Sequence, residues 1–199
     1  MVDEATEDIT KMAAMSPSET TYFDTSVAAH AKHRIAWLLI LMFSSTITGS
    51  IITKYKNAFA AIPLLVSFIP MLMDTGGNCG SQSSTLIIRG IALGEIRFSD
   101  LFRVMFKEFR VSLIVGVVLA LANGLRILIM YRNAGLALVI GLSLVATVII
   151  SKLIGCLLPL FAKKLHMDPA IMASPLITTL VDTCSILIYF NIATRIFQL

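Results

Sequence analysis

The sequence contains few of the residues that keep a soluble protein in water. Only 14% of its 199 residues are charged and 8% are aromatic, whereas 57% are apolar and the mean hydropathy is +0.86. A soluble domain has about 25% charged and about 45–50% apolar residues, because much of its surface must be polar. This composition excludes a soluble globular chain, and its wealth of apolar residues excludes a disordered one. The sequence therefore predicts an all-α integral membrane protein.

Metal-binding and redox motifs are equally scarce. The three cysteines, Cys79, Cys156 and Cys184, lie in apolar stretches without CxxC spacing, so we expect buried free thiols and neither disulfides nor a zinc site. The net charge of +4 and the pI near 9.1 would suit a nucleic-acid partner if the protein were soluble. In a membrane protein they are better explained by basic cytoplasmic loops, so no nucleic-acid partner is expected.

Five stretches are long and apolar enough to cross a bilayer, which takes about 20 residues. They run from about Ile35 to Thr53, Phe59 to Ile88, Val111 to Tyr131, Leu136 to Phe161 and Ala170 to Phe197. Most Lys and Arg residues outside these stretches fall on the side of the N-terminus. The positive-inside rule therefore predicts a multi-pass protein of the cell (plasma) membrane, with its N-terminus in the cytoplasm and its C-terminus outside.

Residues 35–199 are thus expected to form one transmembrane domain of five helices. Residues 1–34 hold six of the twelve acidic residues and are expected to form a linker helix and a lead-in on the cytoplasmic side. The loop from Gly90 to Lys107 alternates apolar and basic residues, which predicts an amphipathic helix along the inner surface. Arg126 and Lys152 fall inside predicted spans, but close enough to span ends for their charges to reach the membrane surface.

Two of the predicted spans carry polar residues at helical spacing. In the last span these are Ser174, Thr178, Asp182 and Ser185, and in the second they are Asp74, Asn78, Ser81 or Gln82, Thr85 and Arg89. Steps of three or four residues place each set on one helix face. At 1.5 Å per residue, Asp182 and Asn78 both lie about 16–18 Å from the cytoplasmic surface, near the centre of a core about 30 Å thick. We therefore expect the two stripes to meet at one level.

Helix breakers and small residues mark further features of the spans. In the second span Pro63, Pro70 and the glycine-rich segment from Gly76 to Gly80 are expected to interrupt the helix and to expose backbone. In the fourth span the small residues Ser143, Thr147, Ser151 and Gly155 recur every four residues. Small residues at this spacing let helices approach closely, so the row predicts helix packing.

Asp74 and Asp182 are the only acidic residues deep inside the predicted spans. Carboxylate, hydroxyl, amide and carbonyl oxygens suit a hard cation such as Mg2+ or Ca2+, whereas zinc or copper would favour His or Cys. One carboxylate is a weak ligand set, but two chains related by a twofold axis along the last span would pair their Asp182 side chains across a pore. Mg2+ keeps much of its hydration shell, so such a pair would hold the ion through its waters.

Three other interpretations stay open at this point. A protonated aspartate hydrogen-bonded between helices would have a structural role. An intramembrane aspartate can also relay protons in a proton-coupled divalent cation carrier that uses the same site. A pair of aspartates could form a proteolytic site, but the GxGD pattern of intramembrane aspartyl proteases is absent, so no enzymatic activity is expected.

The segments that carry the two polar stripes resemble a known family. PMLMDTGGNCGSQSSTLIIRGIALGEI, from Pro70 to Ile96, resembles the second transmembrane helix of the MgtE family of magnesium channels. DPAIMASPLITTLVDTCSILIYFNIA, from Asp168 to Ala193, resembles the fifth helix of that family. The segment EATEDITKMAAM near the N-terminus resembles the linker helix that joins the family's cytosolic regulatory domains to the pore. The resemblance covers the whole chain.

The resemblance implies a homodimer in the lipid bilayer, with a path for Mg2+ on the twofold axis between the subunits. Asp182 matches the family's pore aspartate, which binds hydrated Mg2+. The other implied pore positions are Gly77, Asn78, Ser81 and Thr85 in the second span and Thr178 and Ser185 in the fifth, with the role of Asp74 left open. Ser81 stands where many members have Asn. The family's amino-terminal and CBS domains, which sense cytosolic Mg2+, are missing from this sequence, so fully regulated gating is not expected.

Overall fold

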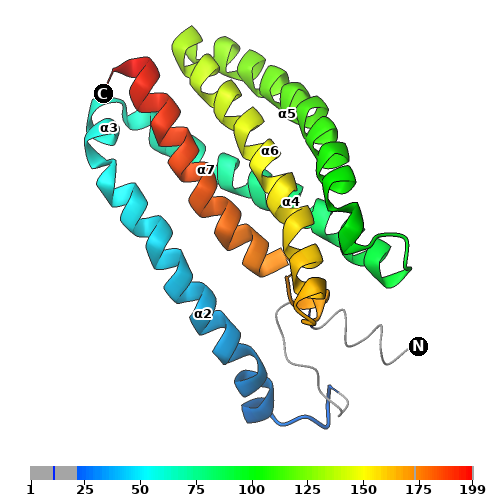
Figure 1. Cartoon of the computed structure of the whole chain (residues 1–199). Coiled ribbons are helices and arrows are strands. Elements are labelled where there is room, and N and C mark those ends of the chain that lie inside the picture. Colours follow the sequence, from blue (N-terminus) through cyan, green and yellow to red (C-terminus); the bar gives the residue numbers. More distant parts are fainter. Residues whose placement is uncertain (1–10, 12–21, 173, 199) are drawn as a thin grey trace.

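The computed structural model describes residue 11, residues 22–172 and residues 174–198, and this part of the chain consists of helices joined by short turns (Figure 1). The helices are α2 (Val27–Lys54), α3 (Lys56–Ala61), η1 (Pro63–Phe68), α4 (Ile69–Ala92), η2 (Phe98–Asp100), α5 (Leu101–Tyr131), α6 (Ala134–Lys164), η3 (Pro169–Met172) and α7 (Ser174–Phe197), where η denotes a 3-10 helix. The linker helix predicted near the N-terminus falls mainly on residues 1–10 and 12–21, which lie outside the described residues.

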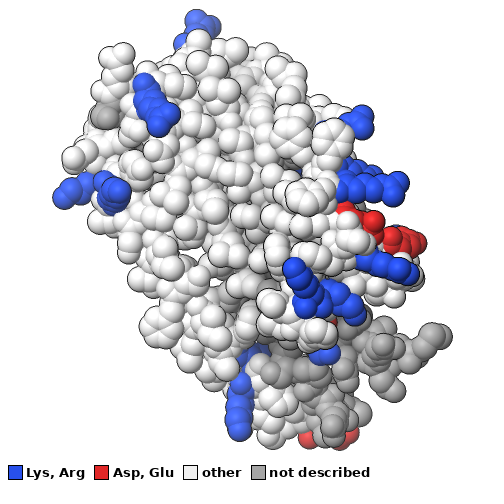
Figure 2. Space-filling view, viewed as in Figure 1, with Lys and Arg blue, Asp and Glu red and all other residues white. Residues whose placement is uncertain are grey.

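Four of the described helices are long and apolar enough to cross a membrane, where the sequence predicted five. They are Val27–Lys54, Phe98–Tyr131, Ala134–Lys164 and Pro175–Phe197. The expected second span corresponds to α4, whose 24 residues reach about 36 Å and would cross the core, but whose polar stripe lowers its hydropathy. Lys and Arg lie mainly toward the ends of the molecule in Figure 2, and most of the flank seen there is uncharged. The chain is a multi-pass membrane protein.

The predicted interruption of the second span occurs at only one of the predicted places, Pro63. The chain breaks before Ile69, where α3 and η1 form a short hairpin, and from Ile69 the helix runs unbroken through the glycine-rich segment. Pro70 does not break α4, because it occupies the first turn, where a missing N–H costs no helical hydrogen bond. The predicted interruption of the Phe59 to Ile88 stretch is therefore confirmed at Pro63, where η1 begins, and was wrong at Pro70 and at the glycines.

The predicted amphipathic surface helix between Gly90 and Lys107 is also absent from the described structure. Helix α4 continues to Ala92 and α5 begins at Leu101, which leaves a short link that includes η2. Gly94 has a φ of 71°, a left-handed conformation that favours glycine, and the N–H groups of the next two residues donate to the carbonyl of Gly90. Of the basic residues assigned to a surface helix, Arg103 and Lys107 lie on the first turns of α5, whereas Arg97 lies in the link before η2.

Helix α6 lies between α4, α5 and α7 and packs against all three. Its small residues Ser143, Thr147 and Ser151 are at most 1% exposed, and Gly155 faces the backbone of Gly80 on α4. The prediction that this row serves helix packing is confirmed. Helix α2 is the exception in the bundle, because it runs along one flank beside α7 and exposes most of its side chains (Figure 1).

Two apolar clusters hold the ends of the bundle. One gathers residues of η1, α4, α5, α6 and α7, and there the buried hydroxyl of Tyr189 donates to the carbonyl oxygen of Leu65 at 2.8 Å. The other is formed by Ile87, Val104, Cys156 and Leu160 at the opposite end of α4. All three cysteines are free, and only Cys184 is partly exposed. Because the clusters lie at the two ends, they leave the polar stripes of α4 and α7 between them.

Candidate functional site

The glycine-rich segment of α4 is the surface on which α7 packs. A Cβ atom at Gly77 would lie 2.9 Å from Cγ2 of Thr178, and one at Gly80 would lie 2.6 Å from Cγ2 of Ile177. Both distances are shorter than side chains tolerate, so the glycines permit the close approach of the two helices. The prediction that the polar segments of α4 and α7 meet at one level is confirmed by this contact.

The two intramembrane carboxylates lie beside this contact. Asp182 projects from α7 and is half-buried, whereas Asp74 projects from α4 and is exposed. They are close enough to interact electrostatically. The sequence placed both residues deep in the membrane, and the structure brings them to the same side of the α4–α7 pair.

Four polar side chains of α4 line an open groove on the surface of this helix. This groove has a volume of about 630 Å³ and is lined by Asn78, Ser81, Gln82, Thr85 and Leu86. Within it, the hydroxyl of Thr85 donates to the carbonyl oxygen of Ser81 at 2.9 Å. The groove therefore offers amide and hydroxyl oxygens on a face of α4 that the other described helices leave uncovered.

Three residues of the predicted site lie in or near the helix contact instead of in the groove. Ser185 is only 1% exposed and lies on the face of α7 that meets Gly76. Gly77 is buried beneath Thr178, whose own hydroxyl donates to the carbonyl oxygen of Pro175 at 3.0 Å. The geometry thus separates the predicted site into an open polar face around Asn78 and a packed face around Ser185.

The described residues of one chain do not form a complete cage for a metal ion. No group of three or more His, Cys, Asp or Glu side chains that could hold a metal occurs among them. What one chain offers is oxygen donors: two carboxylates, the amide of Asn78 and several hydroxyl groups. Oxygen donors in small number suit a cation that keeps most of its water ligands, as Mg2+ does.

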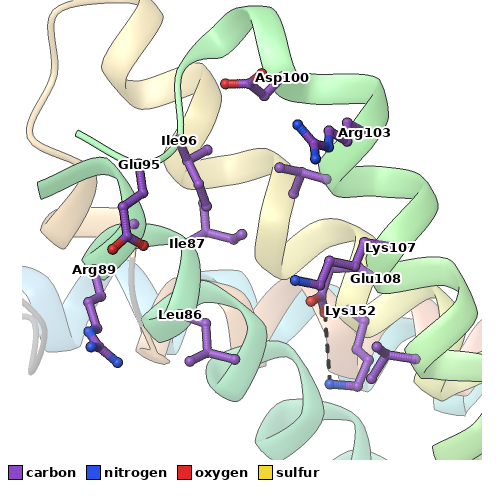
Figure 3. Close-up of a pocket in the computed structure, with 13 residues that line it drawn as sticks. Leu86, Ile87, Arg89, Glu95, Ile96, Asp100, Arg103, Lys107, Glu108 and Lys152 are labelled. Atoms are coloured by element: carbon purple, nitrogen blue, oxygen red, sulfur yellow. Dashed lines mark ion pairs between the residues drawn. The ribbon is translucent and has the colours of Figure 1, made fainter. Parts of the chain in front are cut away.

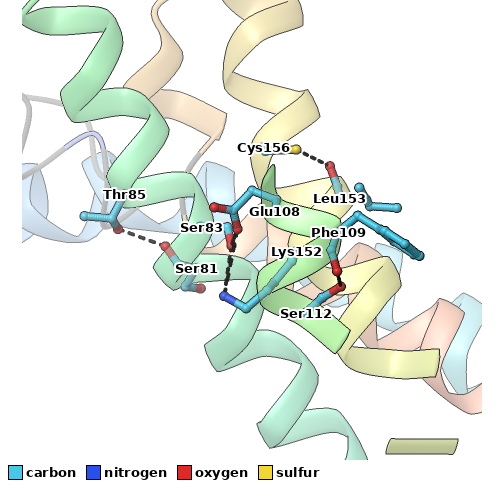
Figure 4. Close-up of polar contacts among 9 residues, drawn as sticks. All are labelled: Ser81, Ser83, Thr85, Glu108, Phe109, Ser112, Lys152, Leu153 and Cys156. Atoms are coloured by element: carbon cyan, nitrogen blue, oxygen red, sulfur yellow. Dashed lines mark hydrogen bonds and ion pairs between the residues drawn. The ribbon is translucent and has the colours of Figure 1, made fainter. Parts of the chain in front are cut away.

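Sequence reasoning missed a buried polar cluster behind the groove. The Nζ of Lys152 on α6 donates to the hydroxyl of Ser83 on α4 at 3.2 Å, and Ser83 in turn donates to Oε2 of Glu108 on α5 at 2.6 Å (Figure 4). The ammonium and the carboxylate form an ion pair at 3.9 Å. Lys152 is 5% exposed, so the prediction that its charge reaches the membrane surface was wrong. Glu108 fell between the predicted surface segment, which ends at Lys107, and the predicted span, which begins at Val111, so it was not considered as a partner for the lysine.

This cluster fixes the rotation of α4 about its axis. Ser83 is fully buried, and its hydroxyl is hydrogen-bonded to Glu108 on α5 and to Lys152 on α6. Residues two positions away on a helix point about 200° around the axis. Ser81 and Thr85 therefore project to the other side of α4, into the groove. Because buried charges are costly unless paired, the contact of Lys152 and Glu108 with Ser83 holds this orientation firmly.

Comparisons with known proteins show the family to which the chain belongs. The sequence profile of MgtE, described as a divalent cation transporter, matches residues 69–192. The chain is 40% identical over 194 residues to the "Magnesium transporter MgtE" of Bacillus subtilis (strain 168), which covers 98% of this chain and 43% of that protein. It is 36% identical over 197 residues to the protein of the same name from Thermus thermophilus, with coverage of 98% and 43%.

A third relative, the "Magnesium transporter MgtE" of Enterococcus faecalis, is 33% identical over 192 residues, covering 96% of this chain and 42% of that protein. The chain therefore spans less than half the length of these relatives. The matched segment contains α4, α5, α6 and most of α7, the helices that build the groove and the buried cluster. The chain belongs to the MgtE family of divalent cation transporters.

Proposed function

We propose that this chain forms a Mg2+ channel in which the ion passes the carboxylate of Asp182. The observation that carries the proposal is the position of Asp182, which is half-buried on α7 beside the contact of α7 with the glycine-rich segment of α4. The amide and hydroxyl groups of the α4 groove lie on the same pair of helices. The names of the relatives, which are magnesium transporters, support Mg2+ as the ion carried.

The complete path is formed by two copies of the chain. A twofold axis along α7 would bring the two Asp182 carboxylates face to face, and would close the open α4 grooves over a shared pore. In this arrangement the water shell of the ion is contacted by Asn78, Ser81, Thr85 and Thr178. Asp74 provides carboxylates at a second level of the pore. Gly77 and Ser185 serve the close packing of the pore helices. Helix α4 then crosses the membrane in addition to the four apolar helices, and its polar face is shielded from lipid by its neighbours and by the second copy.

The paired carboxylates would bind the hydrated ion without stripping its water. Mg2+ gives up water reluctantly, so contact through water keeps binding weak enough for release into the next site. A negative-inside potential contributes about 2.3 kcal/mol per charge per 100 mV, which drives a divalent ion inward without a coupled ion. We place the N-terminus in the cytoplasm and the C-terminus outside, because this orientation keeps most basic residues inside.

A flux experiment separates the channel from the proton-coupled carrier. The purified chain is reconstituted into liposomes, the membrane potential is clamped, and Mg2+ uptake is followed with and without a protonophore that collapses the proton gradient. The channel predicts that uptake is unchanged by the protonophore and follows the clamped potential. Uptake that stops when the proton gradient is lost, at the same potential, would contradict the channel and favour the carrier.

A further inference from the structure

A second cavity lies at the other side of the buried cluster, between the end of α4, η2 and the first turns of α5 (Figure 3). Its volume is about 650 Å³, within the range of about 300–1,000 Å³ that is usual for small-molecule sites. One part of its wall is apolar and includes Ile87, Ile96 and Val104. The rest is charged, and Lys152 and Glu108 of the buried cluster lie at its base.

The charges that line this cavity do not cancel. The carboxylate of Glu108 is paired with Lys152, and the carboxylate of Asp100 accepts the backbone N–H of Arg97 at 3.0 Å. The other lining charges are the cations Arg89, Arg103 and Lys107 and the carboxylate of Glu95. In the part of the chain that the structure describes, the side chains of the three cations make no hydrogen bond and no ion pair. With the Lys152–Glu108 pair set aside, the cavity presents three cations against the two carboxylates of Glu95 and Asp100, which leaves one positive charge in excess.

The position of the cavity indicates what these cations would meet. It lies at the turn where one helix of the membrane bundle ends and the next begins, which is the level of lipid headgroups. Arg103 and Lys107 lie one turn apart on α5 and extend toward the side of α5 that faces α4 (Figure 3). Basic pockets between membrane helices at this level bind anionic lipid headgroups, and the apolar wall matches the glycerol and upper acyl region of a lipid.

We propose that this cavity binds the phosphate group of an anionic phospholipid, with Arg103 and Lys107 as its principal ligands and Arg89 on the opposite wall. The lipid would rest on the α4–α5 turn, directly above the Lys152–Glu108 pair that orients α4. Binding does not require that the chain conduct Mg2+, so the proposal stands independently of the channel. It gives the two basic residues of α5, Arg103 and Lys107, an anionic partner of complementary charge.

The test is a lipid titration of the full chain in detergent micelles, followed by native mass spectrometry. Phosphatidylglycerol is compared with phosphatidylcholine for the wild type, for Arg103→Gln, for Lys107→Gln and for the double variant. Each substitution is expected to weaken phosphatidylglycerol binding about five-fold, and both together about thirty-fold. Glu95→Gln removes the opposing carboxylate and is expected to strengthen binding.

Arg110→Gln is the matched control, because Arg110 lies on the same helix, is exposed, and is outside the cavity lining. The site is supported if Arg110→Gln leaves phosphatidylglycerol binding unchanged while Arg103→Gln weakens it. An equal loss in both variants would show general attraction to a basic surface and would overturn the proposal. Equal affinity for the two lipids would also overturn it. Displacement of the lipid by inorganic phosphate at millimolar concentration would overturn it as well, because the cavity would then be a site for free phosphate.

Discussion

The contact between Gly155 on α6 and Gly80 on α4 gives the sharpest test of the packing. A Cβ atom at residue 155 would lie 3.0 Å from the carbonyl carbon of Gly80 and 3.1 Å from its Cα. Carbon atoms in good contact lie about 3.5–4.0 Å apart, so Gly155→Ala must push the two helices apart by several tenths of an ångström. The atoms that would have to yield are backbone, so rotation of a side chain cannot relieve the clash.

The expected cost follows from two opposing effects. Overpacking of this kind costs about 1–3 kcal/mol, and alanine gains about 1 kcal/mol over glycine in a helix interior. Because backbone meets backbone here, we expect the upper part of that range and a net loss of about 2 kcal/mol. Gly124→Ala on α5 is the control, since a Cβ at that position meets nothing within 4 Å. It should stabilise the helix by up to about 1 kcal/mol.

Denaturant unfolding of the two variants in the same micelles, followed by circular dichroism, measures this difference. The reasoning predicts that Gly155→Ala is less stable than the wild type and that Gly124→Ala is at least as stable. If the two substitutions changed the unfolding free energy equally, the close contact of α4 and α6 would be refuted. Because α4 carries the groove, Gly155→Ala should also lower Mg2+ flux, whereas Gly124→Ala should not.

Three further predictions concern single contacts. Glu108→Gln should destabilise the chain by about 3–5 kcal/mol by leaving Lys152 unpaired, and adding Lys152→Met should recover most of the loss, as a double-mutant cycle of unfolding free energies will show. Tyr189→Phe should cost about 1 kcal/mol, measured by the same unfolding assay, because a buried backbone carbonyl loses its donor. Burial alone would raise the pKa of Asp168, but the hydrogen bond from Lys11 helps to hold that pKa below its ordinary value of 3.8. The contact should therefore stabilise the fold fully above that pH and be lost as the pH falls through the lower folded-state pKa, a dependence that Asp168→Asn should abolish in unfolding measured against pH.

Patterns that repeat along a helix predicted the structure well. The row of small residues in α6 was assigned to packing, and the structure buries Ser143 and sets Gly155 against α4. The contact between the polar segments of α4 and α7 followed from counting the helical rise of each predicted span. The assignment to the MgtE family, made from the residues of α4 and α7, is confirmed by the matched relatives.

Features that depend on partners distant in sequence were not predicted. The role of Lys152 was predicted from its distance to the end of a span. Its partners Ser83 and Glu108 lie 69 and 44 positions away, so the sequence around Lys152 does not indicate them. The start of α5 was placed too late because its first turns are basic, although those turns project beyond the apolar span. Because hydropathy alone set the start of this helix, Glu108 was left outside it and was not recognised as the partner of Lys152.

The central claim, that Mg2+ passes Asp182, is tested most directly by measuring Mg2+ flux into liposomes at a clamped potential for the wild type, Asp182→Asn and Asp182→Glu. Loss of the paired charges should reduce flux by about ten-fold or more in Asp182→Asn, because the two carboxylates contribute at least about 1.4 kcal/mol to holding the ion. Asp182→Glu, which keeps the charge, should retain a measurable part of the flux. Undiminished flux and unchanged ion selectivity in Asp182→Asn would contradict the account, and the ion path would then have to lie elsewhere in the bundle.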